Sequence, residues 1–340
     1  MTTFLRWTLI YFIAASAVNF VLRGDGLFTL FKVLTTSGSV SSLMVALAPV
    51  AVILMAVSYR TSQDIREFAT RIALSLGAIA ICSVFLASFS SLKTAMPFMV
   101  EVFGLSHFFA DPFFADLDNV LHFGTDPWVW THAATQFLGW SNFASHASTL
   151  YGLWWAIPAF YLPAMMILIG EDKATFRHYL ILYFFAWVVL GNIVAPASFS
   201  AGPIYYDTIF GTERYAALYP AMVLGGIEGS WIGRVQPLLW EAYVTNDQAV
   251  GGGISAFPSL HIALAMLTAI YLHEKSKWFS LIGVPFVLAM LFISVWTGYH
   301  YAIDGYFSVL AVYAAHRYLK RRPAQAADRQ LVKQSIEAAT

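Results

Sequence analysis

The sequence predicts an all-α membrane protein with about eight transmembrane helices, because the chain is hydrophobic, carries little charge and contains long apolar runs. Hydrophobic residues make up 59% of the 340 residues and charged residues 11%, against about 25% charged in soluble globular domains. One crossing of the hydrocarbon core needs about 20 apolar residues. The predicted spans are residues 5–22, 41–58, 72–90, 149–170, 178–195, 257–273, 279–297 and 301–318.

These spans divide the chain into three predicted parts. Residues 1–71 hold two accessory N-terminal helices, residues 72–320 form the main membrane domain, and residues 321–340 are a polar cytoplasmic tail. The first span also has features of a signal peptide, since Ala15-Ser16-Ala17 fits a cleavage site. Both interpretations of the first span stay open, and neither changes the orientation of the rest.

The basic residues are unevenly distributed between the two sides of the predicted bundle. With a cytoplasmic N-terminus, the cytoplasmic side carries 14 of the 19 Lys and Arg residues. Positively charged loops stay in the cytoplasm, so we expect both termini there, in a multi-pass protein of a bacterial inner membrane. The other side keeps Arg23, Lys32, Lys93, Arg214 and Arg234.

Two long segments, residues 91–148 and 196–256, fall on the non-cytoplasmic side and are rich in aromatic residues. Within the first, phenylalanines alternate with Asp111, Asp116 and Asp118, which is typical of short interfacial helices with an apolar face and an acidic face. A folded cap over the bundle is the alternative interpretation.

Composition also limits the partners. The formal net charge is zero, so nothing indicates nucleic-acid binding. Cys82 is the single cysteine, which excludes an internal disulfide and a cysteine zinc site. The sequence gives no sign of an obligate protein partner.

A first candidate motif occupies residues 251–261, which read Gly-Gly-Gly-Ile-Ser-Ala-Phe-Pro-Ser-Leu-His and lead into the sixth span. Glycines allow close backbone approach to a ligand, and a helix beginning near Pro258 would offer unpaired N–H groups that suit an anion. Ser259 and His261 would then stand where a phosphate could bind. A plain turn before a helix is the alternative, and Gly251 could serve either.

A second candidate motif leads into the eighth span, where His300 and Asp304 are four residues apart and would share a helix face. A carboxylate on Nδ1 would leave the Nε2 lone pair available as a nucleophile. A structural pair joining helix ends is the alternative. Because two crossings separate the sixth and eighth spans, His261 and His300 should meet on the non-cytoplasmic side.

The two motifs together resemble those of the type 2 phosphatidic acid phosphatase superfamily. Pro258-Ser259-Leu260-His261 looks like its Pro-Ser-x-His motif, and His300 with Asp304 looks like its His-x-x-x-Asp motif. The sequence of residues 298–304, Gly-Tyr-His-Tyr-Ala-Ile-Asp, most resembles the corresponding motif of inositol phosphorylceramide synthases and their bacterial relatives. The resemblance covers about residues 190–318 and implies a six-helix core bundle.

The resemblance also implies a role for each residue. His300 would attack phosphorus and form a phosphohistidine, and Asp304 would orient it. His261 would protonate the leaving group and then act as a base on water or an alcohol. Ser259 would help to hold the phosphoryl oxygens. No metal ion or cofactor would be needed, and no metal-ligand spacing stands out.

This chain departs from the family at its basic residues. The motif of Lys, six residues and Arg-Pro is absent from residues 197–207, and Ser294 stands where an arginine usually precedes the second histidine. Arg214 and Arg234 are therefore the main candidates for binding phosphate, with Lys93 third. Either arginine could instead pair with a glutamate, Glu213 or Glu241.

A further polar cluster, Asp118, His122 and Asp126, could bind a headgroup or an acceptor alcohol, or could form an interfacial turn. The leading function is transfer of a phosphate-containing headgroup between lipids, as in inositol phosphorylceramide synthases. A lipid phosphate phosphatase that uses water is the nearest alternative. A transporter with a His/Asp relay fits less well, because the ionisable residues gather at one surface. A catalytically dead member finds no support.

Overall fold

The computed structural model describes residues 1–24, 39–140, 142–247 and 252–337, so Lys32 and Gly251 lie outside the described residues. Within these ranges the chain forms helices and no strand, which confirms the all-α prediction. The helices are α1 (Thr2–Arg23), α3 (Ser39–Thr61), α4 (Ile65–Thr94), α5 (Met96–Val102), α6 (Asp111–Leu121), α7 (Pro127–Phe137), α8 (Phe143–Ser148), η1 (Thr149–Trp154), α9 (Trp155–Leu168), α10 (Lys173–Phe184), η2 (Phe185–Val194), α11 (Ala195–Ala197), α12 (Pro203–Phe210), α13 (Leu218–Leu224), α14 (Trp231–Val244), α15 (Leu260–Lys275), η3 (Lys277–Phe279), α16 (Ser280–Trp296) and α17 (Ala302–Glu337).

The long helices carry the membrane signal. Five described stretches are long and apolar enough to cross a membrane, namely Thr2–Arg23, Ile65–Thr94, Phe143–Leu168, Lys173–Ala197 and Lys277–Trp296. The chain is therefore an integral membrane protein. The other three predicted spans fall on α3, α15 and α17, so the total of eight and the six-helix core stay predictions. Helix α17 also runs through most of the predicted tail, as far as Glu337.

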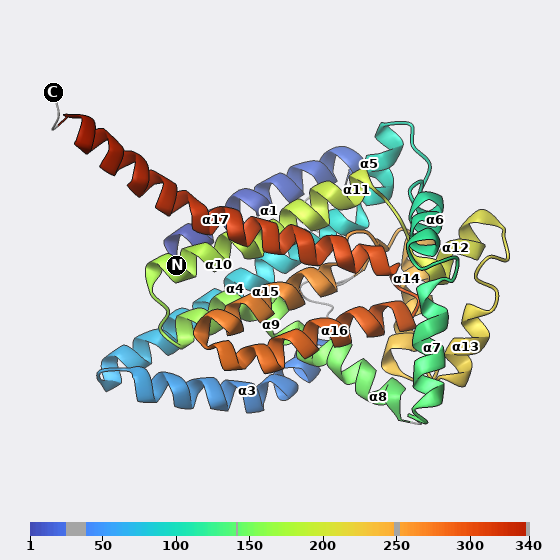
Figure 1. Ribbon diagram of the computed structural model, residues 1–340, viewed down its shortest axis with the longest axis horizontal. Coiled ribbons are helices and arrows are strands. Elements are labelled where there is room, and N and C mark those ends of the chain that lie inside the picture. Colours follow the sequence, from blue (N-terminus) through green and yellow to red (C-terminus); the bar gives the residue numbers. More distant parts are fainter. Residues whose placement is uncertain (25–38, 141, 248–251, 338–340) are drawn as a thin grey trace.

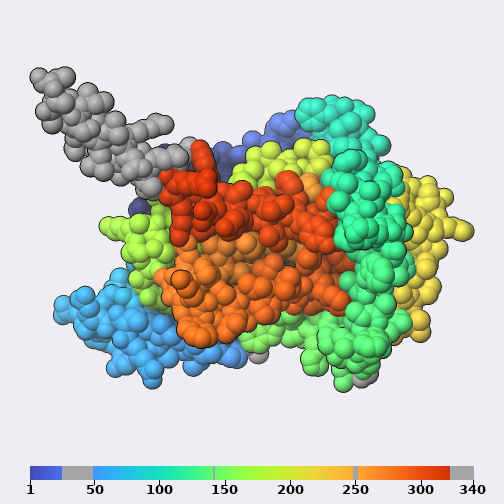
Figure 2. All heavy atoms as spheres, viewed as in Figure 1, coloured from blue at the N-terminus to red at the C-terminus, as the bar shows by residue number. Residues whose placement is uncertain are grey.

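The long helices run roughly side by side, and α5, α6, α7, α12, α13 and α14 gather at one end of them (Figure 1). Figure 2 shows that α6 and α7 cross that end in front of α12, α13 and α14. The start of α1 lies at the opposite end (Figure 1). We call the end with the short helices the capped end. The sequence predicts short helices in the first of the two outside segments, where α5 and α6 lie, and the second outside segment contains α12, α13 and α14.

One prediction about these short helices is wrong. Asp111 and Asp118 were assigned to a water-facing acidic side of α6, but they are 0% and 3% exposed. Asp116 alone of the three is exposed. The two buried carboxylates point inward because each accepts hydrogen bonds from backbone N–H groups of other segments.

Helix α15 packs against α9, α10, α16 and α17. Its sequence is apolar around much of its circumference, which is expected of a buried helix. Its far end is held by Glu171, which accepts a hydrogen bond from the Tyr271 hydroxyl at 2.6 Å and pairs with Lys275. The buried side chains of α15 are Ile262, Ala263, Leu264, Ala265, Leu267, Ala269, Ile270 and Tyr271.

Candidate active site

The starts of α15 and α17 meet at the capped end, and His300 lies between them. His300 Nδ1 is 3.1 Å from Asp304 Oδ2, and Nε2 is 3.3 Å from Ser259 Oγ. His300 is 6% exposed and Asp304 is 0% exposed. Asp304 also accepts a hydrogen bond from the Tyr301 N–H at 3.0 Å. A carboxylate on Nδ1 orients the ring and directs Nε2 toward the Ser259 side.

Two local details differ from the sequence-based expectation. Helix α15 begins at Leu260, with Ser259 as the N-cap residue, instead of near Pro258. The Ser259 side chain makes no capping bond, so its hydroxyl is available to His300. His300 precedes α17, which begins at Ala302. The histidine therefore lies in a loop, and Asp304 in the first helical turn reaches back to it.

His261 stands in the first turn of α15 and is fixed by aromatic rings on both faces. Its ring stacks on Tyr151 at 4.1 Å and on Trp155 at 4.0 Å, between ring centroids. Trp155 Nε1 also donates to the His261 carbonyl oxygen at 2.9 Å. The centroids of the His261 and His300 rings are 6.3 Å apart. The two imidazoles therefore lie close enough to act on the same substrate group.

The π-helical stretch η1 supplies Tyr151, one of these stacking rings. π-Helical turns within α-helices often occur at functional sites. The Tyr151 hydroxyl is buried and has no hydrogen-bond partner among the described residues. The sequence alone does not indicate Tyr151 or Trp155, since two aromatic residues four apart at the start of an apolar span are ordinary packing residues in most helices.

Asp111, at the start of α6, is a second buried carboxylate that the sequence analysis did not place in the site. It accepts hydrogen bonds from the N–H groups of Ala201 and Gly202 at 2.6 and 3.0 Å and from the Tyr301 hydroxyl at 2.7 Å. Burial raises the pKa of Asp111 to about 7, and the nearby Asp304 charge acts in the same direction. Asp111 thus joins the segment before α12 to the residue next to His300.

The segment before α12 packs directly on the two loops that lead to Ser259 and His300. Ser200 Oγ accepts a hydrogen bond from the Phe257 N–H at 3.0 Å, and its carbonyl accepts one from Ala256 at 2.8 Å. Gly202 has φ +93, and a Cβ there would lie 2.3 Å from the Tyr299 carbonyl oxygen. Only glycine allows this close backbone approach.

The predicted headgroup cluster lies beside the start of α17. Both carboxylate oxygens of Asp118 accept backbone hydrogen bonds, from the N–H of Ala302 at 3.0 Å and of Ile303 at 3.1 Å. His122 Nε2 is 3.0 Å from the Tyr306 hydroxyl, and Asp126 accepts from Asn119 at 2.9 Å. Asp118 therefore caps the helix that carries Asp304. A role of the cluster in binding a headgroup stays a prediction.

The predicted phosphate-binding arginines have other surroundings. Arg214 donates to Asp116 and to the Ala115 carbonyl, and lies 3.7 Å from Asp126. It pairs with neither glutamate considered above. Arg234 is exposed on α14. Among the described residues, neither arginine has a recorded contact with His261 or His300.

Lys93, the third candidate, lies closer to the histidines. It stands in the last turn of α4, and its charge acts on both His261 and His300. The part of the chain that the structure describes holds no group of three His, Cys, Asp or Glu side chains suited to a metal ion.

Comparison with known proteins adds to this geometry. Residues 113–318 match the model of the PAP2 superfamily, the type 2 phosphatidic acid phosphatases, over more than half of the chain. The chain belongs to the PAP2 superfamily. No curated protein and no solved structure gives a significant match. PAP2 superfamily members are phosphatases or phosphotransferases, so membership supports an enzyme of that kind. The PAP2 match includes Ser259, His261, His300 and Asp304.

Proposed function

We propose that the protein transfers a phosphate-containing headgroup from one membrane lipid to the hydroxyl group of another through a phosphohistidine at His300. The observation that carries this proposal is the placement of His300, with Nδ1 on Asp304 and Nε2 toward Ser259. This orientation gives a nucleophile directed at the start of a helix, where backbone N–H groups favour a phosphate.

In the first step, His300 Nε2 forms a bond to phosphorus while the bond from phosphorus to the oxygen of the lipid alcohol breaks. His261 donates its proton to that oxygen, and Asp304 stabilises the positive charge on the His300 ring. In the second step, His261 takes the proton of the acceptor hydroxyl, whose oxygen attacks phosphorus and releases His300. Acid–base help of this kind contributes about 10²–10⁴-fold.

The stacking of His261 between Tyr151 and Trp155 supports its role as the acid and base. A ring held on both faces keeps its position between the first and the second step. Aromatic walls also exclude water, and exclusion of water is what separates transfer to an alcohol from hydrolysis.

The scarcity of cations supports a phosphodiester as the donor. A phosphodiester carries one negative charge, whereas a phosphomonoester carries about 1.5 to 2 at neutral pH. The basic motif that is missing from residues 197–207 would suit the more highly charged group. The resemblance to inositol phosphorylceramide synthases adds an inositol phosphate headgroup and a sphingolipid alcohol to the proposal. The uneven loop charges support a site on the non-cytoplasmic face, and a bacterial inner membrane completes the proposal.

The test uses purified protein and its His300→Ala variant, each incubated with phospholipids labelled in the headgroup phosphate and with ceramide as acceptor. A new labelled lipid without free phosphate is the expected product of the native protein. Release of free phosphate would mark a phosphatase instead. Equal product formation by the native protein and His300→Ala would refute the catalytic role of His300.

A further inference from the structure

The proposed transfer needs a positive charge beside the phosphate, and the residues expected to supply it are occupied or distant. Arg214 is neutralised by Asp116 and approached by Asp126. Arg234 is exposed on α14 and has no recorded contact with either catalytic histidine. Without a cation, Ser259 and the helix start would have to bind the anion alone.

We propose that Lys93, from the last turn of α4, is the residue that binds the phosphate of the donor lipid. This inference rests on the proposed function and names the cation for the same site. Lys93 lies outside residues 113–318, the part that matches the superfamily model. The match therefore assigns no role to it.

The packing of α4 directs Lys93 toward the start of α15. Phe89 is four residues before Lys93 and so lies on the same face of α4. A Cβ added to Gly191 would meet the Phe89 ring at 2.7 Å and Leu260 at 2.9 Å. Phe89 of α4 and Leu260 of α15 thus both lie against Gly191 of η2. Lys93 is one turn further along α4, toward the capped end.

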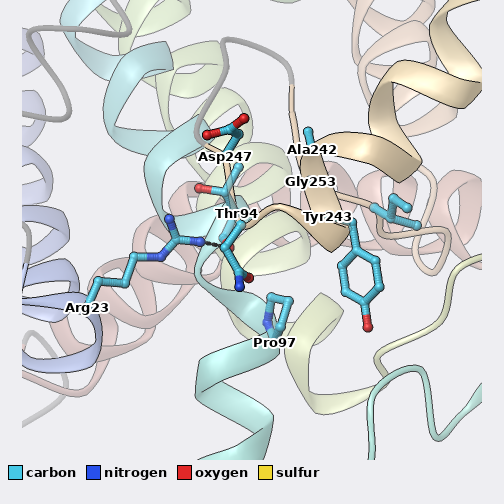
Figure 3. A pocket seen from close by; sticks show the side chains of 9 residues that line it. Arg23, Thr94, Pro97, Ala242, Tyr243, Asp247 and Gly253 are labelled. Carbon is cyan, nitrogen blue, oxygen red and sulfur yellow. Dashed lines mark hydrogen bonds between the residues drawn. The ribbon is translucent and has the colours of Figure 1, made fainter.

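The loop that leads to Ser259 lies on Lys93 itself. A Cβ added to Gly253 would be 3.0 Å from the Lys93 carbonyl oxygen and 3.1 Å from its Cγ. Gly253 has φ +84, so glycine permits both this conformation and this approach. Gly253 also lines a small pocket together with Thr94 and Arg23 (Figure 3). In this pocket the Arg23 side chain donates a hydrogen bond to the Thr94 carbonyl oxygen.

The surroundings of the Lys93 ammonium suit an anionic ligand. Its charge acts on His261 and on His300, and no carboxylate among the described residues pairs with it. Lys93 is partly buried. A buried charge without a partner is unfavourable, and a phosphate bound at Ser259 would supply the missing negative charge.

The experiment measures headgroup transfer and inhibition by inorganic phosphate for the native protein and for Lys93→Met, Lys93→Gln and Lys93→Arg. Lys173→Met is the matched control, because Lys173 is an exposed lysine at the start of α10. Hydrogen bonds to charged groups imply that Lys93→Met lowers kcat/KM about 10- to 100-fold. The inhibition constant for phosphate should rise by a similar factor. Lys93→Arg should recover much of both losses, and Lys173→Met should match the native protein.

Two outcomes separate the failure of this inference from failure of the proposed function. If His300→Ala is inactive while folded Lys93→Met or Lys93→Gln keeps native kcat/KM and native phosphate inhibition, the role of Lys93 is refuted. If His300→Ala keeps native activity, the proposed function itself fails. Should Lys93→Met not fold, Lys93→Gln decides, and folding is checked by the thermal unfolding midpoint.

Discussion

Replacing Asp118 with alanine tests whether this carboxylate positions the catalytic loop or contacts the substrate. In the structure, both oxygens accept N–H groups at the start of α17, two residues and one residue before Asp304. Ala302 is 2% exposed, so its N–H would lose its partner without gaining water. Each unsatisfied buried donor costs about 1–3 kcal/mol. Because Ile303 is only partly buried, we expect a total loss of about 2–4 kcal/mol.

The effect on activity follows from the displacement of Asp304. A shift of about 1 Å in a catalytic group can reduce the rate about 10²-fold. We therefore expect Asp118→Ala to lower kcat strongly and to leave KM for the acceptor close to native. Asp118→Asn keeps one acceptor oxygen, so its kcat should lie between that of the native protein and that of Asp118→Ala.

The assay combines the thermal unfolding midpoint in detergent with kcat and KM for headgroup transfer. Asp116→Ala is the control, since Asp116 is exposed on the same helix and exposed ion pairs contribute about 0–1 kcal/mol. A native kcat with a raised KM for the acceptor would refute the positioning role. That result would favour the role in binding headgroup or acceptor that the sequence suggested.

Three more predictions follow from single contacts. Gly202→Ala would place a Cβ 2.3 Å from the Tyr299 carbonyl oxygen, so we expect loss of activity and a lower unfolding midpoint; a native midpoint would contradict this. The pKa of Asp111 is raised to about 7, so its contribution to stability is present below about pH 4 and is lost as the pH rises through about 7. The midpoint of the native protein minus that of Asp111→Asn should therefore be larger at pH 5 than at pH 8, and a pH-independent difference would argue against the shift. Tyr151→Phe keeps the ring on His261 and removes a buried hydroxyl that has no recorded partner, so its midpoint should equal or exceed the native one; a fall of several degrees would show an unrecognised bond.

The long helices could be located from the sequence because a membrane imposes a length and a composition on each crossing. For this reason the run at 72–90 falls inside α4, and the run at 279–297 covers the whole of α16. Whether the apolar residues of α15 face lipid or protein is harder to predict. Eight of its 16 residues are buried against other parts of the protein, so its apolar character reflects contact with protein as much as contact with lipid.

The site could be predicted where its residues are close in the chain. His300 and Asp304 are in contact because they are four positions apart at a helix start. Long-range partners were not predictable in this way. Asp111 and Asp118 read as surface carboxylates, because nothing local indicates that backbone N–H groups about 90 and 184 residues away point at them.

The cations illustrate the same limit. The sequence favours Arg214 and Arg234 because arginines are scarce on the outside, yet lying on the same side of the membrane does not decide spatial proximity. Lys93 comes from a helix far earlier in the sequence, and only the packing of α4 against η2 and the start of α15 brings it near His261 and His300.

The most direct test of the phosphohistidine is to trap it. Native protein would be mixed with phosphatidylinositol labelled in its phosphate, quenched in alkali during the first turnover and digested, and the labelled peptide identified by mass spectrometry. We predict label on His300, none in the His300→Ala variant, and slower labelling in His261→Ala, which lacks the acid of the first step. Turnover at the native rate with no label on His300, or with label on another residue, would contradict the mechanism.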